Sequence, residues 1–145
     1  MKRKFASVLA LVLVFSICTM PTAQAHTNSI QASKYLSSYS AYVWAEGKGN
    51  MSIYFDVQAT GDMDELGALS IRLQEKASGS STWKTVKSFS HNDYSNMLSS
   101  DYDYYGSNVS YSGKSGYSYR AYVTIWAGKN GSGDSREILT GTITA

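Results

Sequence analysis

The stretch from Gly116 to Gly128 constrains the fold most, because two kinds of residue alternate along it. A period of two residues is the period of a β-strand. One set of alternate positions suits a protein core: Tyr117, Tyr119, Ala121, Val123 and Ile125. The other set includes Arg120, Tyr122 and Trp126. The pattern therefore predicts a central strand whose outward face carries two large aromatic side chains.

The first 25 residues have the pattern of a secretory signal peptide. A basic start, Met1 to Lys4, precedes an apolar run from Phe5 to Met20, and Ala23-Gln24-Ala25 offers the small residues that a signal peptidase requires. The run is shorter than the roughly 20 apolar residues that span a bilayer. We therefore expect residues 1–25 to be cleaved before His26, giving a secreted protein with no membrane association afterwards.

Removal of this segment changes the composition of the chain. The single cysteine, Cys18, is lost, so the core alone must hold the exported domain together. Three of the 13 Lys and Arg residues are lost as well, which leaves 13 − 3 = 10 basic against 11 acidic residues, a net charge of −1. We therefore expect no nucleic-acid partner.

The remaining chain is expected to form a polar, flexible arm over residues 26–37 and one domain over residues 38–145. Alternation of apolar and polar residues, with turn residues between, predicts strands over 39–46, 51–58, 69–74, 83–90, 116–128 and 135–144. The fourth of these has mixed parity, which indicates a bulge or a sheet edge. In the last strand, Leu139 and Ile143 are the expected inward residues.

Two segments give no clear strand pattern. Gly61 to Gly67 is an acidic loop that could make a single helical turn. Residues 91–116 are a long, polar connection with one short strand expected over 108–112.

Seven short strands without a helical period favour an all-β fold, an antiparallel β-sandwich. The last two strands are similar to the closing strands of a fibronectin type III or immunoglobulin-like module. A fibronectin-like order would place the first two strands and the central strand in different sheets.

Two longer strings carry a more particular resemblance. GDMDELGALSI at residues 61–71 and YVTIWAGKNGSGDSR at residues 122–136 resemble a family of small secreted proteins of Gram-positive bacteria, classed as a domain of unknown function. The resemblance covers most of the chain after the signal peptide. It implies export and a compact β domain, and it supplies no catalytic residue.

Aromatic side chains opposite the expected core face are the candidate binding site. They are Tyr42 and Trp44 on the first strand, Tyr54 on the second, and Tyr122 and Trp126 on the central strand, with Arg120 beside them. Flat rings stack on sugars or pack against another protein, although Tyr and Trp also favour strands for packing reasons alone. We predict a non-enzymatic extracellular module that binds a polysaccharide or a protein.

Two metal hypotheses remain beside this prediction. Cleavage would leave His26 with a free amine, and with His91 it could bind copper in a redox enzyme, which is the alternative function. Asp101 and Asp103, two residues apart in the long connection, could bind calcium. No cofactor is expected apart from this calcium ion, and no nucleophile elbow indicates a hydrolase.

Overall fold

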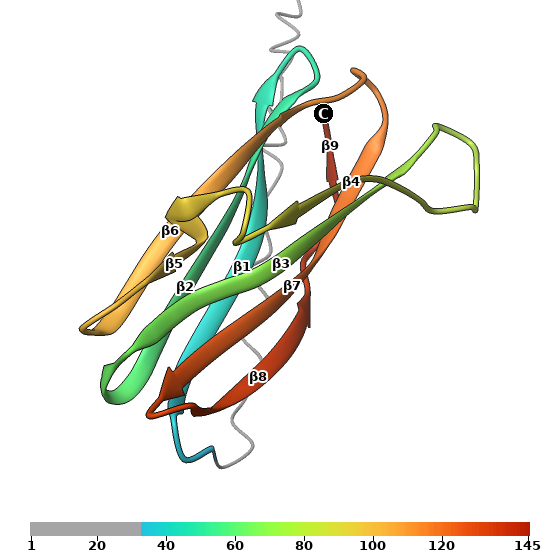
Figure 1. The fold of residues 1–145 in the computed structure, drawn as a ribbon. Coiled ribbons are helices and arrows are strands. Elements are labelled where there is room, and N and C mark those ends of the chain that lie inside the picture. The colour runs from blue at the N-terminus through green and yellow to red at the C-terminus, as the bar shows by residue number, and fades with distance from the viewer. Residues whose placement is uncertain (1–32) are drawn as a thin grey trace, which may run out of the picture.

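The computed structural model describes residues 33–145, which form two antiparallel sheets packed face to face (Figure 1). Sheet A has the order β1-β2-β6, and sheet B has the order β4-β3-β7-β8, with two short strands added at β3 and β7. In sheet A the strands are β1 Leu36–Gly47, β2 Asn50–Met63 and β6 Tyr102–Ser112. In sheet B they are β3 Glu65–Lys76, β4 Lys84–Ser90, β5 Leu98–Ser99, β7 Ser118–Lys129, β8 Ser132–Leu139 and β9 Ile143–Thr144. The predicted all-β antiparallel sandwich is confirmed.

The first two strands and the central strand lie in different sheets. β1 pairs with β2 in sheet A, whereas β7 pairs with β3 on one side and β8 on the other in sheet B. This is the distribution expected of a fibronectin-like strand order. It places the outward residues of β1 and β2 on one side of the sandwich and those of β7 on the opposite side.

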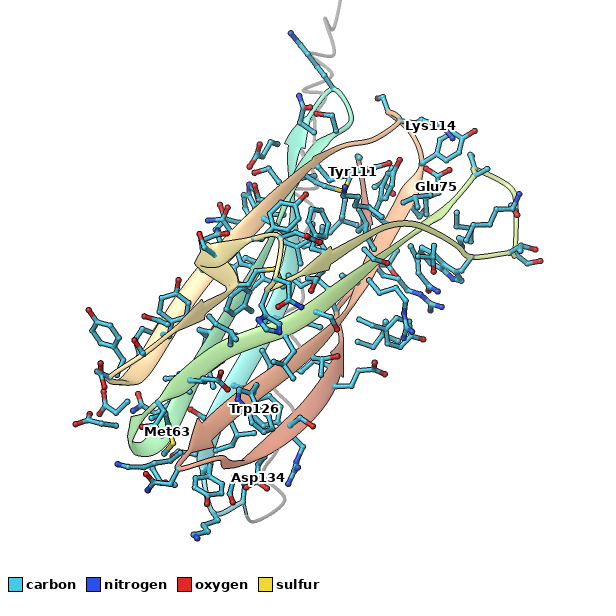
Figure 2. All side chains as sticks on the ribbon, in the orientation of Figure 1. Met63, Glu75, Tyr111, Lys114, Trp126 and Asp134 are labelled. Carbon is cyan, nitrogen blue, oxygen red and sulfur yellow. The ribbon has the colours of Figure 1, made fainter. Side chains whose placement is uncertain are left out.

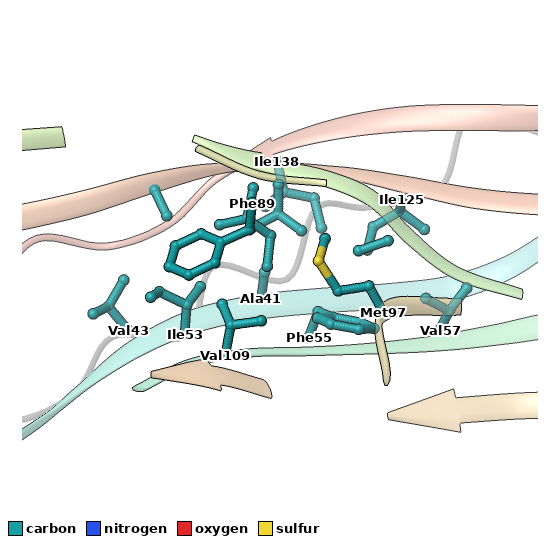
Figure 3. Packing of buried hydrophobic residues seen from close by; sticks show 14 of the residues in the cluster. Ala41, Val43, Ile53, Phe55, Val57, Phe89, Met97, Val109, Ile125 and Ile138 are labelled. Atoms are coloured by element: carbon teal, nitrogen blue, oxygen red, sulfur yellow. The ribbon is translucent and has the colours of Figure 1, made fainter. Parts of the chain in front are cut away.

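The core lies between the two sheets (Figure 3). In the β1–β2 hairpin, Ala41 faces Phe55 and Val43 faces Ile53, and all four side chains are buried. Tyr119, Ala121, Val123 and Ile125 of β7 are fully buried opposite them. Both alternation patterns are therefore confirmed at these positions, because every second residue of each strand points to the same side.

Tyr119 also anchors one end of the sandwich. Its hydroxyl accepts a hydrogen bond from the Lys114 backbone N–H at 2.7 Å and donates one to Glu75 Oε2 at 3.1 Å. Lys114 Nζ lies 2.9 Å from the other Glu75 oxygen, at the upper end of Figure 2. This arrangement is similar to the tyrosine corner of immunoglobulin-type sandwiches, in which a tyrosine near the start of a strand bonds to backbone a few residues upstream, and we call Tyr119, Lys114 and Glu75 the tyrosine corner.

The pKa values of the three groups at this corner are shifted by their contacts with one another and by burial. The Lys114 hydrogen bond, helped by the Tyr119 hydroxyl, lowers the pKa of Glu75 from its ordinary 4.5. The Glu75 hydrogen bond in turn raises the pKa of Lys114, and burial raises the pKa of the Tyr119 phenol. Each shift favours the protonation state in which the three groups bind one another.

The acidic segment from Gly61 to Gly67 is extended, so the expected helical turn is wrong. β2 ends at Met63 and β3 begins at Glu65, and only Asp64 lies between them. The Asp64 backbone N–H donates to the carbonyl of Gly128 at 2.9 Å. The chain crosses from sheet A to sheet B here, and the carbonyl of Gly128 in β7 supplies the hydrogen-bond acceptor that the Asp64 N–H needs, so no helical turn is required to satisfy it.

The connection over residues 91–116 contains much more regular structure than predicted. β6 is an eleven-residue strand in place of the short strand expected over 108–112. In β6, Val109 is the single fully buried hydrophobic residue, so the strand lacks the apolar alternation that identifies a strand from sequence. A 3₁₀ turn over Ser95–Met97 and β5 precede it, and Met97 is fully buried.

The inward assignment of Leu139 is wrong, and changes of register affect which residues are buried in both β8 and β3. Leu139 is 37% exposed, and Ile138 is buried in its place. The expected long last strand breaks after Leu139, so counting by twos back from Ile143 reaches the wrong residue. In β3, a register shift between Ala68 and Ser70 leaves Leu69 only half-buried. The irregular fourth strand, by contrast, lies at a sheet edge with a register shift, as predicted.

The start of the domain differs slightly from the predicted boundary. β1 begins at Leu36, which is 3% exposed, so the last residues of the expected arm belong to the sandwich. Asp134 of β8 accepts hydrogen bonds from the Ser33 hydroxyl and from the backbone N–H groups of Lys34 and Tyr35. The Ser33 hydrogen bond lowers the pKa of Asp134. Residues 1–32, with the predicted signal peptide and His26, lie outside the described part of the chain.

Candidate functional site

The outer face of sheet A carries aromatic rings above a row of small and polar side chains. We call it the tyrosine face and define it by Tyr42, Trp44, Tyr54, Asp56, Tyr104 and Asn108. These residues share a face because strand residues of one parity point to one side. Pairing puts Tyr42 opposite Tyr54, which in turn faces Asn108 on β6. Three of the predicted site residues are therefore brought together here.

Two tyrosines form the centre of the tyrosine face. The rings of Tyr42 and Tyr54 have centroids 5.0 Å apart and are nearly parallel, with an interplanar angle of 12°. Offset stacking of this kind fixes both rings and leaves an outer surface that a flat ligand can cover. Trp44, two residues further along β1, is 50% exposed.

A hollow of about 350 Å³ opens beside this pair. Tyr54 and Asp56 line one side, and Tyr104, Gly106 and Asn108 of β6 line the other. Gly106 faces Asp56 across the sheet and has no side chain to fill the space. The hydroxyl of Tyr104 leans over this glycine, since a methyl group there would lie 3.3 Å from it. Tyr104 is 53% exposed and forms a free-standing wall.

Polar groups border the hollow. Asp56 accepts a hydrogen bond from the Ser40 hydroxyl, which orients the carboxylate and leaves its second oxygen available. The carbonyl of Asn108 accepts a 2.8 Å bond from the Asn96 side chain, so the 3₁₀ turn fixes the edge of β6 at this point. An aromatic floor with a few fixed polar groups can take up a ligand that has both apolar faces and hydroxyl groups.

A second, smaller hollow of about 170 Å³ continues along β6. Its polar side chains are Glu46, Asn50, Ser110 and Ser112. Ser110 lies four residues beyond Gly106, which is about 14 Å along a strand. The two hollows therefore follow one line across the tyrosine face, an arrangement that suits a linear chain.

The other predicted site residues lie on the opposite side of the molecule. Tyr122 and Arg120 belong to the outer face of sheet B, where Arg72 lies 4.8 Å and Arg120 lies 5.9 Å from the centre of the Tyr122 ring. Arg120 also donates to the side chain of Gln74 at 2.9 Å. The ring of Tyr122 is thus covered by the protein's own guanidinium groups.

Trp126 lies at the lower end of sheet B in Figure 2, where it pairs with Ser135, the neighbour of Asp134 in β8. Its ring packs over Gly128 and Gly133, where a methyl group would come within 2.7 Å and 2.6 Å of it, respectively. Its Nε1 donates to Glu65 Oε2 at 2.9 Å. This ring closes the corner between β3, β7 and β8, and with Glu65 it lines a separate hollow of about 400 Å³.

The residues proposed for metals are Asp101 and Asp103 for calcium, and His26 and His91 for copper. Asp101 lies in a turn with φ of 64°, and Asp103 follows in β6 with its carbonyl bonded to Gln58. Within residues 33–145, no group of three or more His, Cys, Asp and Glu side chains could hold a metal ion. His91 donates its backbone N–H to Leu69, and His26 lies outside the described residues. The calcium and copper hypotheses stay predictions.

Besides Tyr42 and Tyr54, the hollow is lined by six residues that the sequence did not indicate as site residues: Phe55, Asp56, Tyr104, Gly106, Ser107 and Asn108. Tyr104 and Gly106 belong to a part of β6 for which the sequence predicts a loop, whereas Asn108 begins the short strand predicted over 108–112. Tyr104, Gly106 and Asn108 are alternate residues of β6, so a strand predicted from residue 102 onward would have placed all three on one face.

The class of protein that the fold and this face define is an antiparallel β-sandwich with an aromatic hollow on one sheet. No family model matches the chain, and neither a curated protein nor a solved structure shows a significant match. The resemblance to a family of secreted Gram-positive proteins therefore stays a prediction. Among residues 33–145 no helix is long and apolar enough to cross a membrane.

Proposed function

We propose that this protein is a secreted, non-enzymatic module whose tyrosine face binds an extracellular polysaccharide. The observation that carries this proposal is the hollow beside the stacked Tyr42–Tyr54 pair, walled by Tyr104 and bordered by Asp56 and Asn108. Sugar rings have an apolar face that stacks on such aromatic rings and hydroxyl groups that bond to such polar side chains.

A polysaccharide suits this face better than a protein partner does. Protein interfaces have an apolar, well-packed centre. Here the rings are surrounded by small polar residues, such as Ser40 and Ser52, and the two hollows continue in one line. A chain of sugar units can occupy both hollows in succession. The apolar centre of a protein interface, by contrast, would find no continuous apolar patch of matching kind on this face.

The test compares two tyrosines on one strand. Tyr104 and Tyr102 are similarly exposed, at 53% and 56%, but only Tyr104 lines the hollow. The chain from His26 onward is screened by thermal shift against linear oligosaccharides of glucose, xylose and N-acetylglucosamine, because a ligand of the folded state raises the Tm. For an oligosaccharide that raises it, Tyr104→Ala should weaken binding by about threefold to tenfold, and Tyr102→Ala by less than about twofold.

A further variant fills the space without removing a ring. Gly106→Val should abolish the binding while leaving the Tm of the free protein almost unchanged, because the backbone of this glycine is not strained and the atom nearest to an added Cβ, at 3.3 Å, is the hydroxyl of the exposed Tyr104 side chain, which can move aside. The proposal is rejected if none of these oligosaccharides raises the Tm, or if the Tyr102 and Tyr104 variants lose binding equally.

A further inference from the structure

The outer face of sheet B has a continuous series of alternating cations and rings. We call it the cationic ladder: Arg72, Tyr122, Arg120, Trp83 and Lys76. Arg72 lies 4.8 Å from the Tyr122 ring centre, and Arg120 lies 4.2 Å from that of Trp83. At the end of the series, Lys76 Nζ lies 5.2 Å from the centre of the Trp83 ring. Every ring in the ladder is in contact with two cations.

The two sheets of the sandwich differ in charge. The strands of sheet A contain no Lys or Arg. They contain four acidic residues, which are Glu46, Asp56, Asp62 and Asp103. The strands of sheet B contain seven basic residues and four acidic ones, a net charge of 7 − 4 = +3. The basic residues are Arg72, Lys76, Lys84, Lys87, Arg120, Lys129 and Arg136. The small net charge of the chain after residue 25, which is −1, therefore conceals one side of the sandwich with positive charge.

The acidic residues of sheet B barely reduce the charge at the ladder. Glu65 bonds to Trp126, Glu75 to Lys114 and Tyr119, and Asp134 to the start of the chain. Glu137 is the one that reaches the ladder, 3.4 Å from Arg72, and both side chains of this pair are about half exposed. An exposed pair at this distance contributes little and can be exchanged for an external anion.

Stacking on the rings prepares the guanidinium groups for binding. A planar guanidinium that lies against an aromatic ring keeps its N–H edges free, and these edges bind carboxylate, phosphate or sulfate oxygens in pairs. Arg120 uses its Nε–H for Gln74, and within residues 33–145 its terminal nitrogens donate no other hydrogen bond. Part of the entropy that an arginine loses on binding has therefore already been lost.

The three cations stand on successive rows of the sheet. Arg72 faces Tyr122, Gln74 faces Arg120, and Lys76 faces Ser118, so each row lies two residues from the next. Two residues of an antiparallel strand span about 6.8 Å. The backbone rows that carry the three cations therefore extend over about 14 Å, which suits a chain of regularly spaced anionic groups better than a single anion.

We propose that the cationic ladder binds a linear polysaccharide that carries sulfate, phosphate or carboxylate groups. This is a second site, on the side opposite the tyrosine face. Single-stranded nucleic acid is a poorer fit, because its bases need aromatic rings to stack on, and both rings here are already in contact with the protein's own cations.

The experiment measures binding of the chain from His26 onward to dextran sulfate, with uncharged dextran as the reference. Arg72→Gln and Arg120→Gln should each weaken binding of dextran sulfate by about fivefold to tenfold. Lys48→Gln, in the exposed turn between β1 and β2, makes the same change in net charge and should weaken it by less than about twofold. Urea unfolding of each variant checks that the sandwich is intact. If Arg120→Gln is unstable, Arg72→Gln alone provides the test.

Three results would overturn this proposal. The first is an equal loss for Lys48→Gln, which would mean attraction by net charge alone. The second is equal binding of uncharged dextran. The third is tighter binding of a single-stranded oligonucleotide with the same dependence on Arg72 and Arg120, which would assign the ladder to nucleic acid. Tyr104→Ala should leave dextran sulfate binding unchanged, so failure of the tyrosine-face proposal is recognised separately.

Discussion

Removal of one oxygen atom, in Tyr119→Phe, tests the tyrosine corner. The ring stays in the core, and two hydrogen bonds disappear, one from the Lys114 N–H and one to Glu75. A bond to a neutral amide contributes about 1 kcal/mol and one to a charged group about 1.5–3 kcal/mol. Because Glu75 keeps its ion pair with Lys114, we take the lower end and expect a loss of about 2–3 kcal/mol.

This loss translates into a large change in melting temperature. At about 2.1 cal/mol/K per residue, the residues from 33 to 145 give an unfolding entropy of about 0.24 kcal/mol/K. The expected fall in Tm is therefore about 8–12 °C. Urea unfolding followed by tryptophan fluorescence gives the free energy of unfolding, and calorimetry gives the Tm.

Tyr111→Phe is the matched control. Its ring packs against Tyr119, with centroids 6.4 Å apart, and its hydroxyl makes no hydrogen bond within the described residues. Loss of that hydroxyl should change the free energy of unfolding by less than about 0.5 kcal/mol. If the two variants lost stability equally, the corner would hold its place by packing alone and the hydrogen-bond reasoning would be refuted.

Two other predictions concern the same framework. Since the pKa of Glu75 is lower in the folded protein than its ordinary 4.5, its contribution is complete above that pH and is lost as the pH falls through the lowered pKa. Glu75→Gln should therefore destabilise the protein at pH 7, and the difference from the unchanged protein should shrink steadily below pH 4.5 in a series of urea titrations. Gly67→Ala should cost about 2–4 kcal/mol in the same assay, because its φ is +147° and an added methyl group would collide with the Met97 carbonyl, whereas Gly61→Ala meets no atom within 4 Å and should be nearly neutral.

The sequence predicts the fold class well where one face of a strand is fully buried. In the β1–β2 hairpin and in β7, nearly all the buried residues are apolar, and residues such as Val43 and Val123 alternate with less buried ones. The tyrosine corner left no comparable signal, because Tyr119 shares its parity with the core and its hydroxyl partners, Glu75 and Lys114, come from other segments. Only the folded chain brings these three together.

The candidate sites are harder to predict from sequence, for a physical reason. Tyr42, Trp44 and Tyr54 are recognisable as outward aromatics, but whether a ring is free depends on neighbours across the sheet. Tyr122 is covered by Arg120 of its own strand and by Arg72 of β3, and nothing in the sequence of β7 indicates the contact with Arg72, which is the closer of the two. The hollow at Gly106 likewise depends on the pairing of β6 with β2, and β6 has almost no apolar alternation from which pairing could be inferred.

The two ends of the described chain lie at opposite ends of the sandwich (Figure 1). Asp134 holds Ser33 at the lower end, and Ala145 is bonded to Gly116 and Tyr117 at the upper end. A pulling force applied between these ends would act along the strands, so the hydrogen bonds between β1 and β2 would be loaded in shear and would share the load. A domain attached in this way, between a fixed support and a moving one, would resist extension while both broad sides stayed open to the surroundings.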